Sequence, residues 1–387
     1  MPRLPRRIAS DLSAKLRSPD TAAVVAGLES RLTERRRGLK VQSGAFRGVR
    51  AVVYRGFVAD DVAKVRVRVI ETPELPGDSR IPYWEVAQSN VRRHAALSIV
   101  GAEVELRIGR FAATEVTDSH GFANFSLPVP KLRVGWHDAH ATVAGIGDDD
   151  APAVGQGWVV KPSLAAPFLV ISDIDDTILL TGLTEGLTMV ARTLLRNVEQ
   201  RSAIPGMSAL YRGLARGVPG RTGKPRPEPA FFYVSTGSWS FYSMLEQFVE
   251  LRSFPAGPMF LTDWGPTERY LRRSGAEHKR AAVRRLFEAY PGMRFVLIGD
   301  SGQRDPLIYE EMAREFPGRV LLAMIRQVGD DEDERNVTLR EHAETLRSAE
   351  IPLYLVPDAE HAAELAHRLQ LCDEHTVTEV AAEMDQP

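Results

Sequence analysis

Residues 168–180 constrain the fold more than any other part of the sequence, and they read Phe-Leu-Val-Ile-Ser-Asp-Ile-Asp-Asp-Thr-Ile-Leu-Leu. The apolar first half is typical of a strand buried in the middle of a sheet, and it ends abruptly in three carboxylates and a threonine. In open α/β sheets, ligands bind just beyond the carboxyl ends of the strands. The stretch therefore predicts a buried strand that delivers Asp173 and Asp175 to a functional site.

After this stretch, apolar strands alternate with amphipathic helices, which predicts a Rossmann-like doubly wound parallel sheet over residues 164–372. The strands that we expect to follow it cover residues 231–235, 259–262, 295–299, 319–325 and 353–356. The helices that we expect cover residues 185–200, 207–216, 239–252, 277–290, 306–316 and 359–369. Residues 329–335 are acidic and are expected to form a loop, and residues 373–387 a C-terminal tail.

The sequence before residue 164 has a different character. Residues 39–163 contain alternating, β-branched segments separated by Gly and Asp clusters, which predicts a small β-sandwich accessory domain. Its turn at residues 117–125 resembles that of transthyretin-like and immunoglobulin-like modules, which bind partners or act as spacers. The run Asp148–Asp150 suggests either a calcium loop or a solvated turn, and the spacing favours the turn because a closing Glu is missing.

Residues 1–38 have helical apolar spacing among arginines, which predicts two amphipathic helices. Such helices either pack on the protein or lie on anionic lipid. No apolar run is long enough for a secretion signal or a membrane span, and the one cysteine, Cys372, fits a reducing compartment. We therefore expect a cytoplasmic protein, with peripheral membrane attachment as the alternative. The net charge of −2 gives no general attraction for nucleic acid, and none is expected as a partner.

Polar residues that can do chemistry fall at the expected strand ends or at the start of a helix. They are Asp173, Asp175, Thr177, Ser235, Thr236, Lys279, Asp300 and Asp305. Each of them alone has an ordinary explanation, such as a helix cap. Because the carboxyl ends of parallel strands meet at one edge of a sheet, we expect the whole set to converge.

Four carboxylates in one site would repel one another unless a cation is present. The strand ends offer oxygen ligands without Cys or His, and Mg²⁺ is the divalent ion that best matches this set. The charge of Lys279 and the hydroxyl of Ser235 are suited to hold phosphate oxygens. The residues therefore predict phosphate chemistry that depends on Mg²⁺.

The order of these motifs resembles that of the haloacid dehalogenase superfamily, whose signature is similar to Asp173-x-Asp175-x-Thr177. Further segments resemble one branch, the actin-patch-protein family of Mg²⁺-dependent phosphatidate phosphatases and its bacterial relatives. These segments include residues 203–207, 232–235, 254–257, 278–279, 295–306 and 317–320. The resemblance is close over about residues 162–328. One departure is Thr236-Gly-Ser-Trp239, where the family often has a proline before the tryptophan.

The resemblance implies a role for each site residue. Asp173 would be the nucleophile that forms an aspartyl-phosphate, and Asp175 the general acid and base. Mg²⁺ would be held by Asp173, the backbone carbonyl of Asp175, Asp300 and Asp305, the last through water or Lys279. Thr177, Ser235, Thr236 and Lys279 would bind the phosphoryl group. Asp176 is expected to support the site from outside it.

Too few residues separate Thr262 from Lys279 for a large cap domain, so we expect an open site with at most a small flap from residues 181–230. An open site suits a headgroup presented at a membrane surface. The leading hypothesis is hydrolysis of phosphatidate to diacylglycerol and phosphate. The alternatives are a phosphatase for a phosphoprotein, a nucleic-acid end or a soluble metabolite, and a non-catalytic adaptor that uses its β-sandwich.

Overall fold

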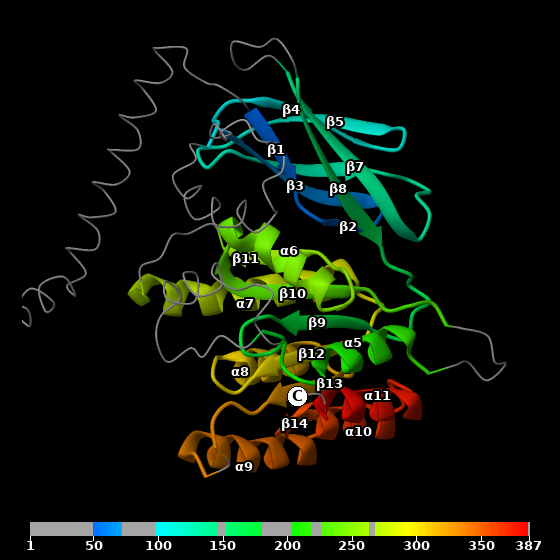
Figure 1. Ribbon diagram of the computed structural model, residues 1–387, viewed down its shortest axis with the longest axis vertical. Coiled ribbons are helices and arrows are strands. Elements are labelled where there is room, and N and C mark those ends of the chain that lie inside the picture. The colour runs from blue at the N-terminus through cyan, green and yellow to red at the C-terminus, as the bar shows by residue number, and fades with distance from the viewer. Residues whose placement is uncertain are drawn as a thin grey trace, which may run out of the picture.

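The computed structural model describes residues 49–71, 98–144, 152–179, 203–218, 226–262, 268–330 and 332–385. Three expectations fall outside these residues: the N-terminal helices, the helix at 185–200 and the Asp148–Asp150 turn. Most of the flap expected from residues 181–230 lies outside them as well. Within them the chain forms two β-sheets, one antiparallel apart from a single strand pair and one parallel (Figure 1).

The first sheet lies in the N-terminal part of the described chain. Its strands are β1 (Val49–Val53), β2 (Gly56–Ala59), β3 (Val62–Glu71), β4 (Glu103–Ile108), β5 (Phe111–Val116), β6 (Phe122–Pro128), β7 (Gly135–Val143) and β8 (Ala153–Lys161). They follow the order β1-β3-β2-β8-β7-β4-β5, and β6 pairs with β3. Buried and exposed residues alternate strictly along β4, so one face lies on a core. A Cβ on Gly157 would lie 2.6 Å from the carbonyl oxygen of Val53, so glycine allows β8 to pack closely on β1.

The second sheet has six parallel strands and confirms the parallel sheet predicted from the sequence. They are β9 (Leu169–Asp173), β10 (Phe231–Ser238), β11 (Met259–Thr262), β12 (Phe295–Asp300), β13 (Val320–Arg326) and β14 (Leu353–Val356). Their order is β11-β10-β9-β12-β13-β14, so β9 is central and every one of its residues is buried. The sheet order reverses direction on either side of β9, which places its carboxyl end at the usual ligand position of such sheets.

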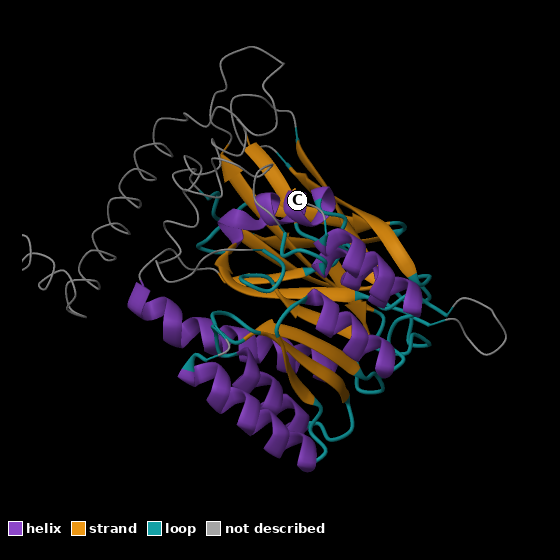
Figure 2. Ribbon diagram, turned by 60° about the horizontal axis from the view of Figure 1, so that its bottom comes forward, coloured by secondary structure: helices purple, strands orange, loops and turns teal. Residues whose placement is uncertain are grey.

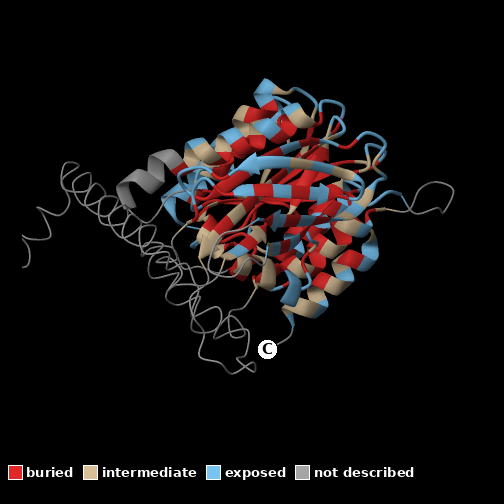
Figure 3. Cartoon of the chain, turned by 90° about the horizontal axis from the view of Figure 1, so that it is seen from above, coloured by how far each residue is buried: buried red, intermediate tan, exposed pale blue. Residues whose placement is uncertain are grey.

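Helices cover both faces of the parallel sheet (Figure 2). On one face, Val170 of β9 shares a hydrophobic core with α5 (Met207–Arg216), α6 (Tyr242–Leu251), α10 (Ala359–Arg368) and α11 (Glu374–Met384). On the other face, Leu169 and Ile171 share a core with α7 (Glu268–Ala289), α8 (Asp305–Glu315) and α9 (Glu334–Ser348). Figure 3 shows buried positions along the strands and exposed positions on the outer sides of the helices. None of the described helices is both long enough and apolar enough to cross a membrane.

Two helices lie where the sequence predicts no helix. Helix α9 begins inside the stretch that was expected to be an acidic loop, because Asp333 caps it by accepting a hydrogen bond from the backbone N–H of Arg335. Helix α11 lies within the expected tail, and its buried Val380 packs in the same core as α5. Both helices bury few side chains, so their apolar periodicity is weak in the sequence.

The two sheets are joined by direct contacts as well as by the chain. Phe57 of β2 packs edge-on against Phe232 of β10, with ring centroids 5.8 Å apart. The hydroxyl of Tyr290 donates a hydrogen bond to the carbonyl of Val58 at 3.0 Å. The N-terminal sheet therefore packs directly against the domain that contains the parallel sheet.

Candidate active site

Asp173 is the last residue of β9, and its side chain is completely buried. Thr177 donates a hydrogen bond to its Oδ2 at 3.0 Å, and the Nζ of Lys279 lies 2.6 Å from its Oδ1. The backbone carbonyl of Asp173 accepts a hydrogen bond of 2.5 Å from Ser172. Every oxygen of this residue is thus held by the strand, the following turn or α7.

The turn after β9, which contains Asp175 and Asp176, is held by backbone hydrogen bonds. Asp176 adopts a left-handed conformation with φ of 53°, and its N–H bonds to the carbonyl of Leu179 at 2.8 Å. Arg326 donates to the carbonyl of Asp176 at 2.7 Å and fastens the turn to β13. The backbone of Asp176 therefore helps to fix the shape of this turn.

A bulge at the end of β10 presents Ser235 to this turn. Val234 pairs with Phe260 and Ser238 pairs with Thr262. Between these two pairs the chain advances four residues along β10 but only two along β11, which is a β-bulge. The hydroxyl of Ser235 donates to Oδ2 of Asp175 at 2.8 Å and accepts from the N–H of Gly237 at 2.9 Å. The bulge holds its shape without the family's proline.

Thr262 supports the bulge from β11. Its hydroxyl lies 3.1 Å from the carbonyl oxygens of both Thr236 and Gly237. The backbone of Thr236 is therefore anchored, while its side chain is only partly buried.

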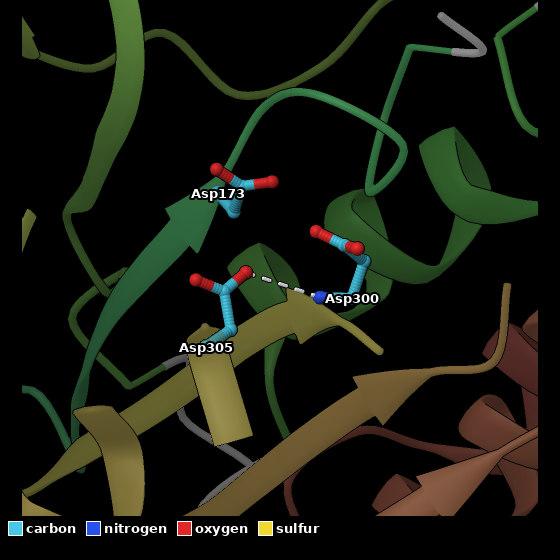
Figure 4. A group of neighbouring side chains, drawn as sticks. All are labelled: Asp173, Asp300 and Asp305. Atoms are coloured by element: carbon cyan, nitrogen blue, oxygen red, sulfur yellow. Dashed lines mark hydrogen bonds between the residues drawn. The ribbon is translucent and has the colours of Figure 1, made fainter. Parts of the chain in front are cut away.

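The end of β12 supplies two more acids. Asp300 is the last residue of the strand, and its Oδ1 accepts hydrogen bonds from the N–H groups of Gly302 and Gln303 at 2.6 and 3.0 Å. Asp305 begins α8, and its Oδ2 accepts a hydrogen bond from the N–H of Asp300 at 3.1 Å (Figure 4). Lys279, only 1% exposed, forms an ion pair with Asp305 as well as with Asp173.

Three of these carboxylates are suited to a metal ion. Asp173, Asp300 and Asp305 each offer an oxygen within 4.8 Å of the other two, and Figure 4 shows them grouped at the ends of β9 and β12. The Oδ2 of Asp300 is buried and has no hydrogen-bond partner among the described residues. A buried carboxylate oxygen without a partner is costly, and a hard cation would satisfy it. The donor set therefore fits the predicted Mg²⁺.

The pKa shifts of the site residues also indicate a bound cation. Burial, followed by the neighbouring Asp305, raises the pKa of Asp300 to about 7. Burial also raises the pKa of Asp173, and Lys279 opposes that rise. Because Lys279 faces several carboxylates, its own pKa is raised and it stays charged, although burial alone would lower it. The cluster contains more negative charge than one lysine balances.

Asp175 stands apart from these three carboxylates. Burial raises its pKa, and the hydrogen bond from Ser235 partly offsets that rise. Its backbone carbonyl accepts a hydrogen bond of 3.3 Å from the side chain of Gln303. The structure thus brings all eight predicted residues to one edge, but the carboxylate of Asp175 faces Ser235.

Some residues that shape the site were missed by sequence reasoning. Gln303 contacts Asp175, and Tyr211 of α5 hydrogen-bonds at 2.7 Å to Ser172, the residue before Asp173. A polar Ser172 inside an otherwise apolar strand was the available signal for a buried partner. Gln303 gave no comparable signal, because a glutamine in a loop is ordinary.

The architecture and the site together describe an α/β domain with a buried centre of carboxylates and one lysine at the carboxyl edge of its parallel sheet. Residues 168–327 match the family described as the catalytic domain of phosphatidate phosphatase APP1. This match confirms the resemblance seen in the sequence over this segment.

Two fungal proteins are similar to the same part of the chain. Phosphatidate phosphatase APP1 of Saccharomyces cerevisiae is 29% identical over 184 residues, which are 46% of this chain and 30% of the yeast protein. An uncharacterized protein of Schizosaccharomyces pombe is 29% identical over 163 residues, 42% of this chain and 25% of its own. The chain therefore spans less than a third of the length of these relatives.

Among solved structures, the chitinase ChiW from a Paenibacillus species is matched over 80% of this chain and 26% of its own. Its sequence identity to this chain is 8% and the TM-score of the match is 0.18, so we draw no structural conclusion from it.

Proposed function

We propose that the protein is a Mg²⁺-dependent phosphomonoesterase with the arrangement of the haloacid dehalogenase superfamily, and that it hydrolyses phosphatidate. The observation that carries this proposal is the buried group in which Lys279 pairs with Asp173 and Asp305 while one oxygen of Asp300 lacks a partner. Such a group fits one cation and one phosphate dianion placed next to a nucleophilic carboxylate.

The first step uses Asp173 and Asp175. An oxygen of Asp173 forms a bond to phosphorus while the bond from phosphorus to the ester oxygen breaks, which leaves an aspartyl-phosphate. Asp175 donates its proton to the departing alkoxide. The raised pKa of the Asp175 carboxyl supports this role, because it favours the protonated form before the reaction.

In the second step Asp175 accepts a proton from water, whose oxygen attacks phosphorus and releases Asp173 and inorganic phosphate. Lys279 stays charged throughout and balances the phosphoryl oxygens. Bound Mg²⁺, held by Asp173, Asp300, Asp305 and the carbonyl of Asp175, would neutralise charge on the transferring group.

Thr177 has a different role from phosphate binding in this proposal. Its hydroxyl is fully buried and donates to Oδ2 of Asp173, so it aims the nucleophile. Ser235 holds Asp175 before substrate binds and then bonds to a phosphoryl oxygen.

The chemistry is tested with purified protein and a soluble aryl phosphate. We expect Asp173→Asn to have no measurable Mg²⁺-dependent phosphate release and Asp175→Asn to lose about 10²–10⁴-fold in kcat. Asp138→Asn is the matched control, because Asp138 is an exposed carboxylate on β7. Activity retained in both site variants would overturn the mechanism.

The substrate is tested by comparing phosphatidate in mixed micelles with soluble phosphomonoesters and phosphopeptides. The relative named as a phosphatidate phosphatase supports a lipid substrate. We expect the highest kcat/KM for phosphatidate. A clear preference for a soluble ester or a phosphopeptide would refute the lipid assignment and leave the chemistry in place.

A further inference from the structure

Two arginines of the N-terminal sheet lie on the side of β1 and β3 that faces away from the core of that sheet. Arg50 is opposite Ile70, and Val52 is opposite Arg68, in the antiparallel register of β1 and β3. The alternating residues Ala51, Val53, Val67 and Val69 belong to the core of the sheet. Arg50 and Arg68 are therefore diagonal neighbours on the outer face, and the spacing of such positions in a sheet is about 7–8 Å between their Cα atoms.

The segment that follows β10 packs against this face. Trp239 lies in a short 3-10 helix, η2 (Trp239–Phe241), directly after the bulged strand that carries Ser235. Its ring centroid is 4.5 Å from that of Tyr54, which follows β1. Arg66 of β3 stacks over the Trp239 ring at 5.1 Å. The N-terminal sheet thus holds the end of the segment that positions Ser235.

A cavity of about 50 Å³ lies between the two surfaces. It is lined by Arg50, Val52, Tyr54, Arg68, Ile70, Trp239, Ser240 and Ser243. Since one water needs roughly 10–15 Å³ of such space, the cavity has room for a group of several heavy atoms, about the size of a phosphate.

The polar groups around this cavity are dominated by hydrogen-bond donors. None of the eight lining residues has a carboxylate, and two have guanidinium groups. Trp239 is 9% exposed, and its indole N–H is buried without an acceptor in the described part of the chain. The Nε of Arg68 is likewise buried and unpaired there.

Buried donors without acceptors are costly, and two neighbouring guanidinium groups repel each other. One oxyanion would relieve both costs, because its oxygens accept several hydrogen bonds and its charge balances the arginines. Ser240 and Ser243 add hydroxyl donors near the start of α6, where the helix dipole also favours an anion.

We propose that Arg50, Arg68, Trp239, Ser240 and Ser243 form a second anion site, which binds a phosphate-class oxyanion at the junction of the two sheets. It is separate from the carboxylate cluster and goes beyond the proposed function. The anion comes either from free phosphate or from the headgroup of an anionic phospholipid. In both cases, occupation ties β1 and β3 to the segment after Ser235.

The indole N–H of Trp239 can report whether this site is occupied. The chain has 5 tryptophans, so an ¹H–¹⁵N correlation spectrum has few indole signals, and Trp239→Phe assigns that of Trp239. We expect inorganic phosphate, without Mg²⁺, to shift this signal saturably. The shift should persist in Asp173→Asn, which leaves this site intact.

In Arg50→Gln/Arg68→Gln we expect phosphate affinity to fall at least about tenfold by this signal, because charge-assisted hydrogen bonds are lost. The single variant Arg50→Gln covers the case in which the double variant fails to fold. Arg50 is exposed, so its replacement should not disturb folding, and it should still weaken phosphate binding several-fold. The charge-matched control is Arg107→Gln/Arg110→Gln on the distant β4–β5 hairpin, where affinity should not change. An absent shift, or an equal shift in Arg50→Gln/Arg68→Gln, overturns the site.

Vesicles distinguish the two sources of the anion. Phosphatidylglycerol is a phosphodiester, so a phosphomonoesterase does not consume it. If a lipid headgroup occupies the site, these vesicles bind the protein more tightly than phosphatidylcholine vesicles, and Arg50→Gln/Arg68→Gln removes the difference. If free phosphate is the ligand, the Trp239 indole signal shifts with inorganic phosphate and does not shift with the vesicles. Neither readout requires turnover, so failure of the proposed catalytic function would leave this result interpretable.

Discussion

Gly299 lies beside the space that the side chain of Asp305 needs. A Cβ added to Gly299 would be 2.5 Å from Oδ2 of Asp305, the oxygen that accepts a hydrogen bond from the N–H of Asp300. We therefore expect Gly299→Ala to push Asp305 out of place and weaken Mg²⁺ binding and activity at least about tenfold, as loss of a metal ligand's support does. Calorimetric titration with Mg²⁺ measures this.

Gly292→Ala is the control for that substitution. Nothing lies within 4 Å of a Cβ at Gly292, so the added methyl group should change neither metal affinity nor folding. Wild-type Mg²⁺ affinity in Gly299→Ala would contradict the role assigned to the glycine.

Lys279 is the buried counter-charge of the site, and its removal leaves Asp173 and Asp305 facing each other. We expect Lys279→Met to lower the free energy of unfolding by about 3–5 kcal/mol in EDTA, because breaking one partner of a buried ion pair leaves charge uncompensated. Urea unfolding with and without Mg²⁺ measures the loss and its partial recovery. Lys64→Met, on an exposed residue of β3, should cost less than about 1 kcal/mol.

The acids and the lysine were predictable at this scale because strand ends in a parallel sheet converge whatever the loop lengths. Asp173 and Asp300 needed only the alternation of strands and helices, whereas Lys279 was expected at the start of a helix and instead lies in the middle of α7. Gln303 and Tyr211 were not predictable, since their contacts depend on side-chain directions across α5 and the loop after β12. The hydrogen bond from Thr177 to Asp173 also depends on the left-handed turn at Asp176.

Helix α11 packs on α5 so closely that one residue of α5 has to be glycine. A Cβ at Gly213 would lie 2.0 Å from Cγ2 of Thr376. We expect Gly213→Ala to destabilise the protein by about 1–3 kcal/mol by forcing the helices apart. Thermal unfolding of Gly213→Ala, Thr376→Ser and the double variant measures the coupling. Serine lacks the methyl group that would lie nearest, so part of the clash is relieved, and it keeps the hydroxyl that bonds to Asp373, although that oxygen would still lie 2.3 Å from the added Cβ.

If the helices contact as described, the double variant is more stable than the sum of the single changes predicts. Strict additivity would show that Gly213 and Thr376 do not touch.

Elements with strong apolar periodicity were predictable, and those without it were not. Strands β11 and β14 and helix α5 have the predicted boundaries. Strand β5 gives no such signal in the sequence, because most of its residues are exposed and show no apolar alternation. Helix α7 begins nine residues before the predicted start, at residue 268 instead of 277.

For the whole molecule, the carboxylate cluster links stability to pH and metal. The pKa of Asp300 in the folded, metal-free protein is about 7, well above its ordinary value near 4. The folded state thus holds a proton that the unfolded state releases, so the contribution of Asp300 to metal-free stability is fully present below about pH 4 and is lost as the pH rises towards 7. Stabilisation by Mg²⁺ should grow over the same interval, because the ion binds the ionised form.

Chemical unfolding in EDTA and in Mg²⁺ from pH 5 to 7 measures both trends. Asp300→Asn lacks the titrating group, so its metal-free stability should depend less on pH and should respond less to Mg²⁺. Metal-free stability that rises with pH in the wild type but not in Asp300→Asn would contradict the prediction.

The central position of β9 has a consequence for local opening. The strand pairs with β10 on one side and β12 on the other, and both of its faces are covered by helices. Its amide hydrogens should therefore exchange with solvent only when the molecule opens globally, which makes them among the slowest in the chain. The proposed nucleophile would then sit on the part of the molecule that fluctuates least, and any motion that admits substrate would have to come from its neighbours.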